Sequence, residues 1–238
     1  MTDYSEIRSK PPVGLMGLWR DGLSEPLPIL SFNFYIDALT LTRDLLDDFE
    51  AREYRPVNSK LLNCIGLWFL MMESGISTVV KAISFTHDVS SLKKLPDKFA
   101  KIPEITSSSP CPTDLQKSEL QEFCCFRNQT FHDLYYERKN TEYTKTHFSK
   151  VPAYANEIDM MEAIRIAVNS LNFYRYAIQG VSLIENNTDM IKVYQEELLP
   201  RFREIMNQKG YTSVIFRNLD AVQSQPLTPG TYTGVIKY

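Results

Sequence analysis

The stretch from residue 59 to residue 85 constrains the fold of this chain more than any other. Its apolar residues recur at the spacing of one helical face, and its charged residues are sparse. The apolar positions are Leu62, Ile65, Phe69, Met72 and Ile76, and the charged ones are Lys60, Glu73 and Lys81. A helix with so little charge needs apolar neighbours around most of its surface. We therefore expect it to be the central helix of a bundle.

Composition narrows the class of protein. A chain of 238 residues can form one large domain, or a domain with an appendage, without disulfide support. Its net charge of −3 excludes a uniformly basic duplex-DNA binder. The four cysteines (Cys64, Cys111, Cys124 and Cys125) form no CxxC pair and fit no zinc spacing. We therefore expect reduced thiols and no metal or other cofactor.

Two segments bear on location. The first residues are polar and contain prolines, so they lack the apolar core of a signal peptide. The most apolar run, residues 61–72, is shorter than the roughly 20 residues that a membrane helix needs. The sequence thus predicts a protein of the cytoplasm with no membrane partner.

Helical periodicity recurs along most of the chain. Besides residues 59–85, we predict helices over about 31–54, 114–138, 156–180 and 187–207. The expected caps are Ser31, Thr113 or Asp114, and Asn156, while Pro200 should kink or divide the last helix and Gly210 should stop it. The two long connections should be loops, over residues 87–112 and 139–155, because they are rich in Pro, Ser or polar residues.

These elements predict a mostly all-α protein whose core is an up-and-down bundle of four to five long helices over residues 31–210. Residues 1–30 carry four prolines and should be an irregular leader. Residues 211–238 contain two runs rich in β-branched and aromatic residues, YTSVIF and TYTGVIKY. We expect these runs to form short strands, which makes the C-terminal tail β-rich.

A polar motif lies in the second half of the third predicted helix. It reads RNQTFH, with Arg127 at its start and His132 five positions later. Asn128 and His132 are four apart and share a helical face, and the long side chain of Arg127 can reach toward them. A histidine transfers protons near neutral pH, and an arginine holds phosphate oxygens. The combination suits phosphodiester cleavage without a metal.

The motif resembles the R-x4–6-H signature of the HEPN family (higher eukaryotes and prokaryotes nucleotide-binding). That family is characterised by a bundle of four or five helices with the motif on a late helix, which agrees with the helix order expected here. Many of its members are metal-independent ribonucleases of toxin–antitoxin or antiphage defence systems. The resemblance covers roughly residues 31–180, and it implies a homodimer whose motif helices face each other.

The same resemblance implies roles for individual residues. Arg127 would hold the scissile phosphate, His132 would act as general acid or base, and Asn128 would orient one of them. The products would be a 2′,3′-cyclic phosphate and a 5′-hydroxyl. An RNA strand would contact the residues that follow the motif, for which the candidates are Tyr136, Arg138, Lys139 and Lys145. An antitoxin or another regulatory partner is a further expectation.

Other interpretations fit the same residues. Arg127 could pair with Glu122 or Glu137 on a neighbouring turn, and His132 could be a buried structural histidine. The bundle would then be a catalytically silent dimerisation or nucleotide-binding module of a larger complex. The dipeptides His87-Asp88 and His132-Asp133 match the HD pair of metal phosphohydrolases, but the further His and Asp in the required helical order are missing.

Overall fold

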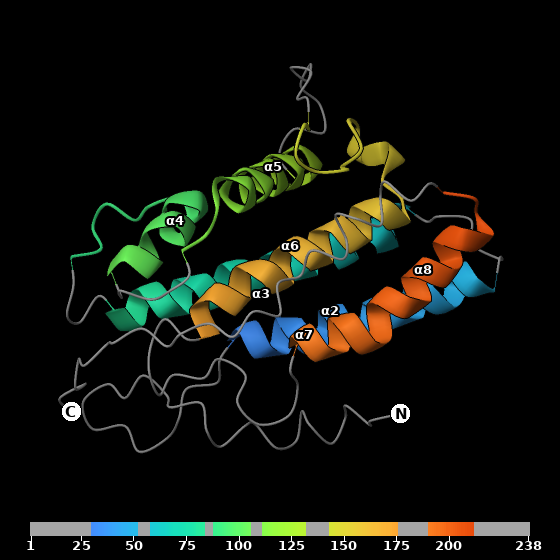
Figure 1. Cartoon of the computed structure of the whole chain (residues 1–238), viewed down its shortest axis with the longest axis horizontal. Coiled ribbons are helices and arrows are strands. Elements are labelled where there is room, and N and C mark those ends of the chain that lie inside the picture. The colour runs from blue at the N-terminus through green and yellow to red at the C-terminus, as the bar shows by residue number, and fades with distance from the viewer. Residues whose placement is uncertain are drawn as a thin grey trace.

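The computed structural model describes residues 30–51, 58–83, 88–105, 111–131, 143–175 and 190–211. Within these ranges the chain forms helices and turns and contains no strand (Figure 1). The α-helices are α2 (Leu30–Glu50), α3 (Asn58–Ile83), α4 (Leu95–Ile105), α5 (Asp114–Phe131), α6 (Glu157–Arg175), α7 (Met190–Val193) and α8 (Leu199–Gln208). The prediction of an all-helical fold is confirmed for this part of the chain.

Helices α2 and α3 pack side by side in opposite directions. Trp68 on α3 donates its ring N–H to Thr42 Oγ1 on α2 at 2.9 Å, and its ring meets Tyr35 edge-on. Nearer the other ends, Lys60 on α3 pairs with Asp48 on α2. These contacts, which pair later residues of one helix with earlier residues of the other, fix the antiparallel register.

Helix α3 lies at the centre of the bundle, as its low charge predicts, with α2, α5 and α6 packed around it. Its two glycines mark the closest approaches. A Cβ atom added to Gly66 would lie 2.8 Å from the Phe131 ring of α5, and one added to Gly75 would lie 2.7 Å from the Leu171 side chain of α6. A larger residue at either position would force these side chains to move.

Helix α6 is the second central element. Its residues from Glu157 to Leu171 are all buried, charged ones included. The helix begins where Asn156 caps it, because Asn156 Oδ1 accepts the N–H of Ile158 at 2.9 Å. In Figure 1, α4 and α5 form a layer over α3 and α6, while α2, α7 and α8 line the opposite side.

The prediction of a loop over residues 87–112 is wrong for its middle, where α4 forms. Leu95, Phe99 and Ile102 recur at helical spacing and are buried against the bundle. Pro96 is the second residue of the helix, where a missing N–H leaves no hydrogen bond unmade. Burial of this short apolar stripe outweighs the proline and serine content on which the loop prediction depended.

The last helical run is divided next to Pro200, as the sequence predicts. Between α7 and α8 the chain forms a π-helical turn, Tyr194–Leu198, immediately before Pro200 in the first turn of α8. At the far end Gly210 adopts φ 70°, and the N–H groups of Gly210 and Tyr211 bond to the carbonyls of Asn207 and Met206. This is the Schellman arrangement that ends helices at glycine.

Leu30 of the predicted leader (residues 1–30) begins α2, while residues 1–29 and the predicted β-rich tail beyond Tyr211 lie outside the described residues. The same is true of the predicted continuation of the motif helix beyond Phe131. Of the helices that the structure does describe, none combines the length and the apolar character that a membrane span requires.

Candidate functional site

The motif lies on α5, which a capping box begins. Thr113 Oγ1 accepts the N–H of Gln116, and the Gln116 side chain accepts the N–H of Thr113 at 2.9 Å. One face of the helix is buried through Leu120, Phe123 and Phe126. This face fixes the rotation of the helix and therefore the direction in which Arg127 and Asn128 project.

Arg127 and Asn128 lie together on the last turns of α5. The Arg127 guanidinium donates to Asn128 Oδ1 at 3.0 Å. Its carbon Cζ also lies 5.0 Å from the centre of the Phe69 ring on α3, within cation–π distance. Arg127 is half-buried and Asn128 is exposed. The arginine is thus held between α3 and α5 with its head beside a polar neighbour.

The remaining predicted site residues divide into two groups. Lys145 lies exposed in the segment between α5 and α6. His132, Tyr136, Arg138 and Lys139 fall outside the described residues. The structure therefore brings together two of the three predicted catalytic residues, and the placement of His132 relative to them stays a prediction.

Glu122, which was a possible ion-pair partner of Arg127, makes different contacts. Its carboxylate accepts the backbone N–H groups of Thr144, Lys145 and Thr146, and the Thr146 hydroxyl donates to it at 2.6 Å. Three successive N–H groups that converge on one anion form a nest. Glu122 therefore anchors the chain that returns along α5.

A buried ionic cluster joins α5 to α6, and periodicity alone did not reveal it. Arg165 donates to both carboxylate oxygens of Glu119, at 2.8 and 3.1 Å, and to both of Glu162, at 3.0 Å each. Arg165 is 1% exposed and Glu162 is 0% exposed. Burial, together with nearby Glu162, raises the pKa of Glu119, although Arg165 opposes that shift.

Asp159 is a further buried carboxylate at the start of α6. Its oxygens accept the N–H and the hydroxyl of Ser149, at 2.6 and 2.8 Å, and the N–H of Asn156 at 2.8 Å. Burial raises the pKa of Asp159 despite these hydrogen bonds. Asp159 thus accepts hydrogen bonds from the loop that precedes α6. The only sequence signal for this role is its position in the first turn of a helix, where acidic residues are favoured.

Two of the four cysteine thiols are buried or partly buried. Cys64 is buried beside Thr42, and Cys124 is partly covered; burial raises the pKa of both thiols to about 12. Neither is therefore suited to nucleophilic chemistry. Among the described residues, His, Cys, Asp and Glu side chains form no group of three or more with the geometry of a metal site.

No family model, no curated protein and no solved structure matches this chain. The functional argument therefore depends on the residues themselves.

Proposed function

We propose that this protein is a metal-independent endoribonuclease of the HEPN type. The observation that carries the proposal is the hydrogen-bonded pair of Arg127 and Asn128 on a bundle helix, with His132 following in the sequence at the motif spacing. A guanidinium whose position is fixed by a neighbouring amide and a ring is suited to bind one phosphate in one orientation.

In the proposed reaction the ribose 2′-oxygen attacks the adjacent phosphorus, and the bond to the 5′-oxygen breaks. Arg127 stabilises the negative charge of the phosphorane. One His132 accepts the 2′-hydroxyl proton, and the His132 of a second copy donates a proton to the leaving 5′-oxygen. The products are a 2′,3′-cyclic phosphate and a 5′-hydroxyl. A homodimer thereby supplies both proton-transfer groups.

We place this activity in the cytoplasm, in a toxin–antitoxin or antiphage defence system, where an antitoxin or another regulatory partner would restrain it. This setting follows from the family resemblance, so it depends on the activity being found.

A second candidate function is supported by one specific contact. The Arg127 guanidinium lies over Phe69 and is half-buried between α3 and α5, an arrangement that also suits a structural arginine. In that case the bundle is a catalytically silent dimerisation or nucleotide-binding module. The two candidates differ in whether replacing Arg127 changes chemistry or only stability.

The test is an incubation of the purified protein with total tRNA and a structured mRNA in the presence of EDTA. Wild type should cleave and leave 2′,3′-cyclic phosphates, while Arg127→Ala and His132→Ala should lose at least about 100-fold in rate, as expected for transition-state and proton-transfer groups. Lys192→Gln, on α7 across the bundle, is the control that should cleave normally. Equal cleavage by all four proteins, or none by wild type with any RNA, contradicts the nuclease and favours the silent module.

Because Arg127 contacts Phe69, its replacement also needs a stability control. Arg127→Lys keeps a cation beside the ring but removes the planar fork that binds two phosphate oxygens. A folded Arg127→Lys protein with little cleavage would assign the loss to chemistry. Normal cleavage by that variant would contradict the phosphate-binding role.

A further inference from the structure

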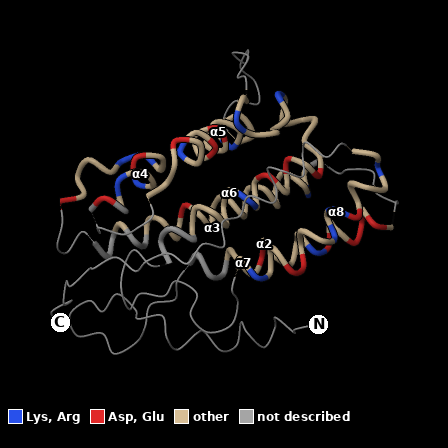
Figure 2. Tube along the Cα trace, viewed as in Figure 1, with Lys and Arg blue, Asp and Glu red and all other residues tan. Residues whose placement is uncertain are grey.

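The segment between α5 and α6 has an unusual distribution of charge. Residues 143–156 contain Lys145, Lys150 and His147 but no Asp or Glu. Lys145 and Lys150 are both exposed. In Figure 2 this segment shows basic positions and no acidic ones. Its surface charge is therefore positive, although the whole chain carries −3.

Carboxylates hold this segment from its inner side. Glu122 accepts the N–H groups of residues 144–146, Glu162 accepts the N–H of residue 147, and Asp159 accepts those of residues 149 and 156. The negative charges thus lie against the backbone, and the lysine side chains extend into water. A backbone fixed in this way loses little conformational entropy when a ligand binds to its outer side.

Aromatic packing completes the anchoring. The Phe148 ring stacks on Phe126 at 4.6 Å and on Phe123 at 5.4 Å between ring centres. The Tyr143 hydroxyl donates to Gln129 at 2.8 Å, and its ring meets Phe126. Tyr143 is therefore a packing residue. The first part of the segment, residues 143–148, thus packs against the later turns of α5.

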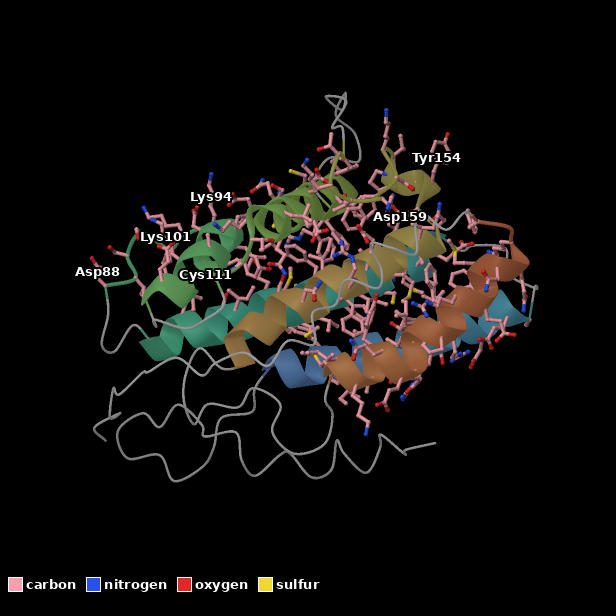
Figure 3. All side chains as sticks on the ribbon, in the orientation of Figure 1. Asp88, Lys94, Lys101, Cys111, Tyr154 and Asp159 are labelled. Carbon is pink, nitrogen blue, oxygen red and sulfur yellow. The ribbon has the colours of Figure 1, made fainter. Side chains whose placement is uncertain are left out.

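Tyr154 behaves differently from these rings. It lies at the end of the short 3-10 turn Pro152–Tyr154, which two backbone hydrogen bonds close. Its side chain is 76% exposed and points away from the bundle, whereas nearby Asp159 lies on the inner side (Figure 3). A fixed turn thus presents an aromatic ring to solvent in the same segment as two exposed lysines.

We propose that residues 143–156 form a docking surface for single-stranded RNA. Lys145 and Lys150 contact backbone phosphates, and the Tyr154 ring stacks on a base. Exposed aromatic rings interleaved with cations are the arrangement by which proteins hold unpaired strands. An acidic protein segment would pair with the charges of the lysines but would offer the tyrosine ring no flat base on which to stack. The proposal extends the proposed function by locating where the strand is held, yet binding at this surface does not require cleavage.

The binding test uses a fluorescently labelled, fully 2′-O-methylated RNA strand of unstructured sequence, which has no 2′-hydroxyl to attack. Fluorescence anisotropy with EDTA present gives the dissociation constant at several salt concentrations. Tyr154→Ala should weaken binding about tenfold, while Tyr154→Phe should bind normally, because stacking needs the ring alone. The double variant Lys145→Gln/Lys150→Gln should also bind more weakly and show a shallower salt dependence. Lys192→Gln is again the matched charge control.

Glu122→Gln tests whether the fixed backbone matters. This change removes a negative charge beside a basic surface, so electrostatics alone predicts tighter RNA binding. Loss of the Glu122 contacts should instead free residues 144–146, raise their amide exchange and weaken binding a few-fold. Weaker binding with faster exchange supports the proposal, whereas tighter binding by this variant contradicts it.

Two further outcomes overturn the docking surface. One is unchanged affinity in both Tyr154→Ala and the double lysine variant, and the other is tighter binding to polyglutamate than to the RNA at equal salt. The nuclease is tested separately. If wild type cleaves RNA but the variants of residues 143–156 bind it normally, the nuclease is supported and the docking surface is contradicted. If those variants bind RNA weakly but wild type does not cleave it, the docking surface is supported and the nuclease is contradicted.

Discussion

Among the charged side chains that join helices in this bundle, two groups differ mainly in their exposure to water. Between α5 and α6, Arg165 is enclosed with Glu119 and Glu162. Between α2 and α8, Arg201 reaches Asp47 and Glu50 at the surface. The hydrogen-bond geometry is similar in the two places. The surroundings, however, are apolar in the first case and aqueous in the second.

The difference shows what burial does to an ion pair. At the surface, water screens the charges and hydrates any partner that is lost, so each pair contributes little. In the interior, the cluster has two carboxylates for one guanidinium, and removal of Arg165 leaves two enclosed carboxylates that neither water nor protein neutralises. The buried cluster is therefore a poor source of stability but a strong constraint on how α5 and α6 can pack.

The largest expected effect follows from removing the buried cation. Arg165→Met keeps an unbranched side chain but leaves Glu119 and Glu162 enclosed without their donor. We expect the free energy of unfolding to fall by about 3–5 kcal/mol, the range for breaking a buried pair from one side. Urea denaturation followed by circular dichroism measures this change.

The matched control for that prediction removes all three charges. In Glu119→Leu/Glu162→Leu/Arg165→Met no charge is left without a partner, so most of the lost stability should return. A single Arg165→Met variant as stable as wild type would show that the cluster does not constrain the packing. A triple variant less stable than the single one would contradict the argument from unpaired charge.

A smaller effect concerns pH. Because burial raises the pKa of Glu119 above its ordinary value of 4.5, the folded protein binds this proton more tightly than the unfolded chain does. The stabilisation is therefore complete below about pH 4.5 and is lost as the pH rises through the raised value. Glu119→Gln cannot titrate at this position. The stability of wild type relative to Glu119→Gln should accordingly increase as the pH falls from 7 toward 4.5.

Thermal unfolding of the two proteins across this pH range tests the sign. The comparison isolates Glu119, because Asp159, whose pKa burial also raises, is present in both proteins. A stability difference that stays constant with pH, or that shrinks on acidification, would show that Glu119 is ionised as readily in the folded protein as in the unfolded chain.

The same contrast explains which parts of the fold the sequence reveals. Helical periodicity, Asn156, Pro200 and Gly210 act within a few residues, so their effects can be predicted from the chain alone. Helix α4 was missed because its stripe of Leu95, Phe99 and Ile102 is short and lies among prolines. Only the bundle surface on which it packs makes this stripe decisive.

In the candidate site, too, the contacts between neighbours in the chain could be predicted from the sequence, and those between distant residues could not. The contact of Arg127 with Asn128 joins neighbours in the chain and follows from the motif. The contact of Arg127 with Phe69 joins two helices and does not. Glu119 and Arg165 are 46 residues apart, and a pattern that assigns charges to the solvent side of a helix cannot pair them in the interior. The exposed ring of Tyr154 lies on a turn that two backbone hydrogen bonds close, and Asp159 holds the chain on either side of it through the N–H groups of Ser149 and Asn156.

The smallest expected effect belongs to the surface pairs. Arg201→Gln removes the contacts with Asp47 and Glu50, yet both carboxylates then regain water. We expect a loss of about 0–1 kcal/mol, which should diminish further in high salt because ions screen exposed charges. A double-mutant cycle with Glu50→Gln, measured by urea denaturation at low and high salt, isolates the pair. A coupling as large as that of the buried cluster would mean that geometry, and not burial, sets the strength of both groups.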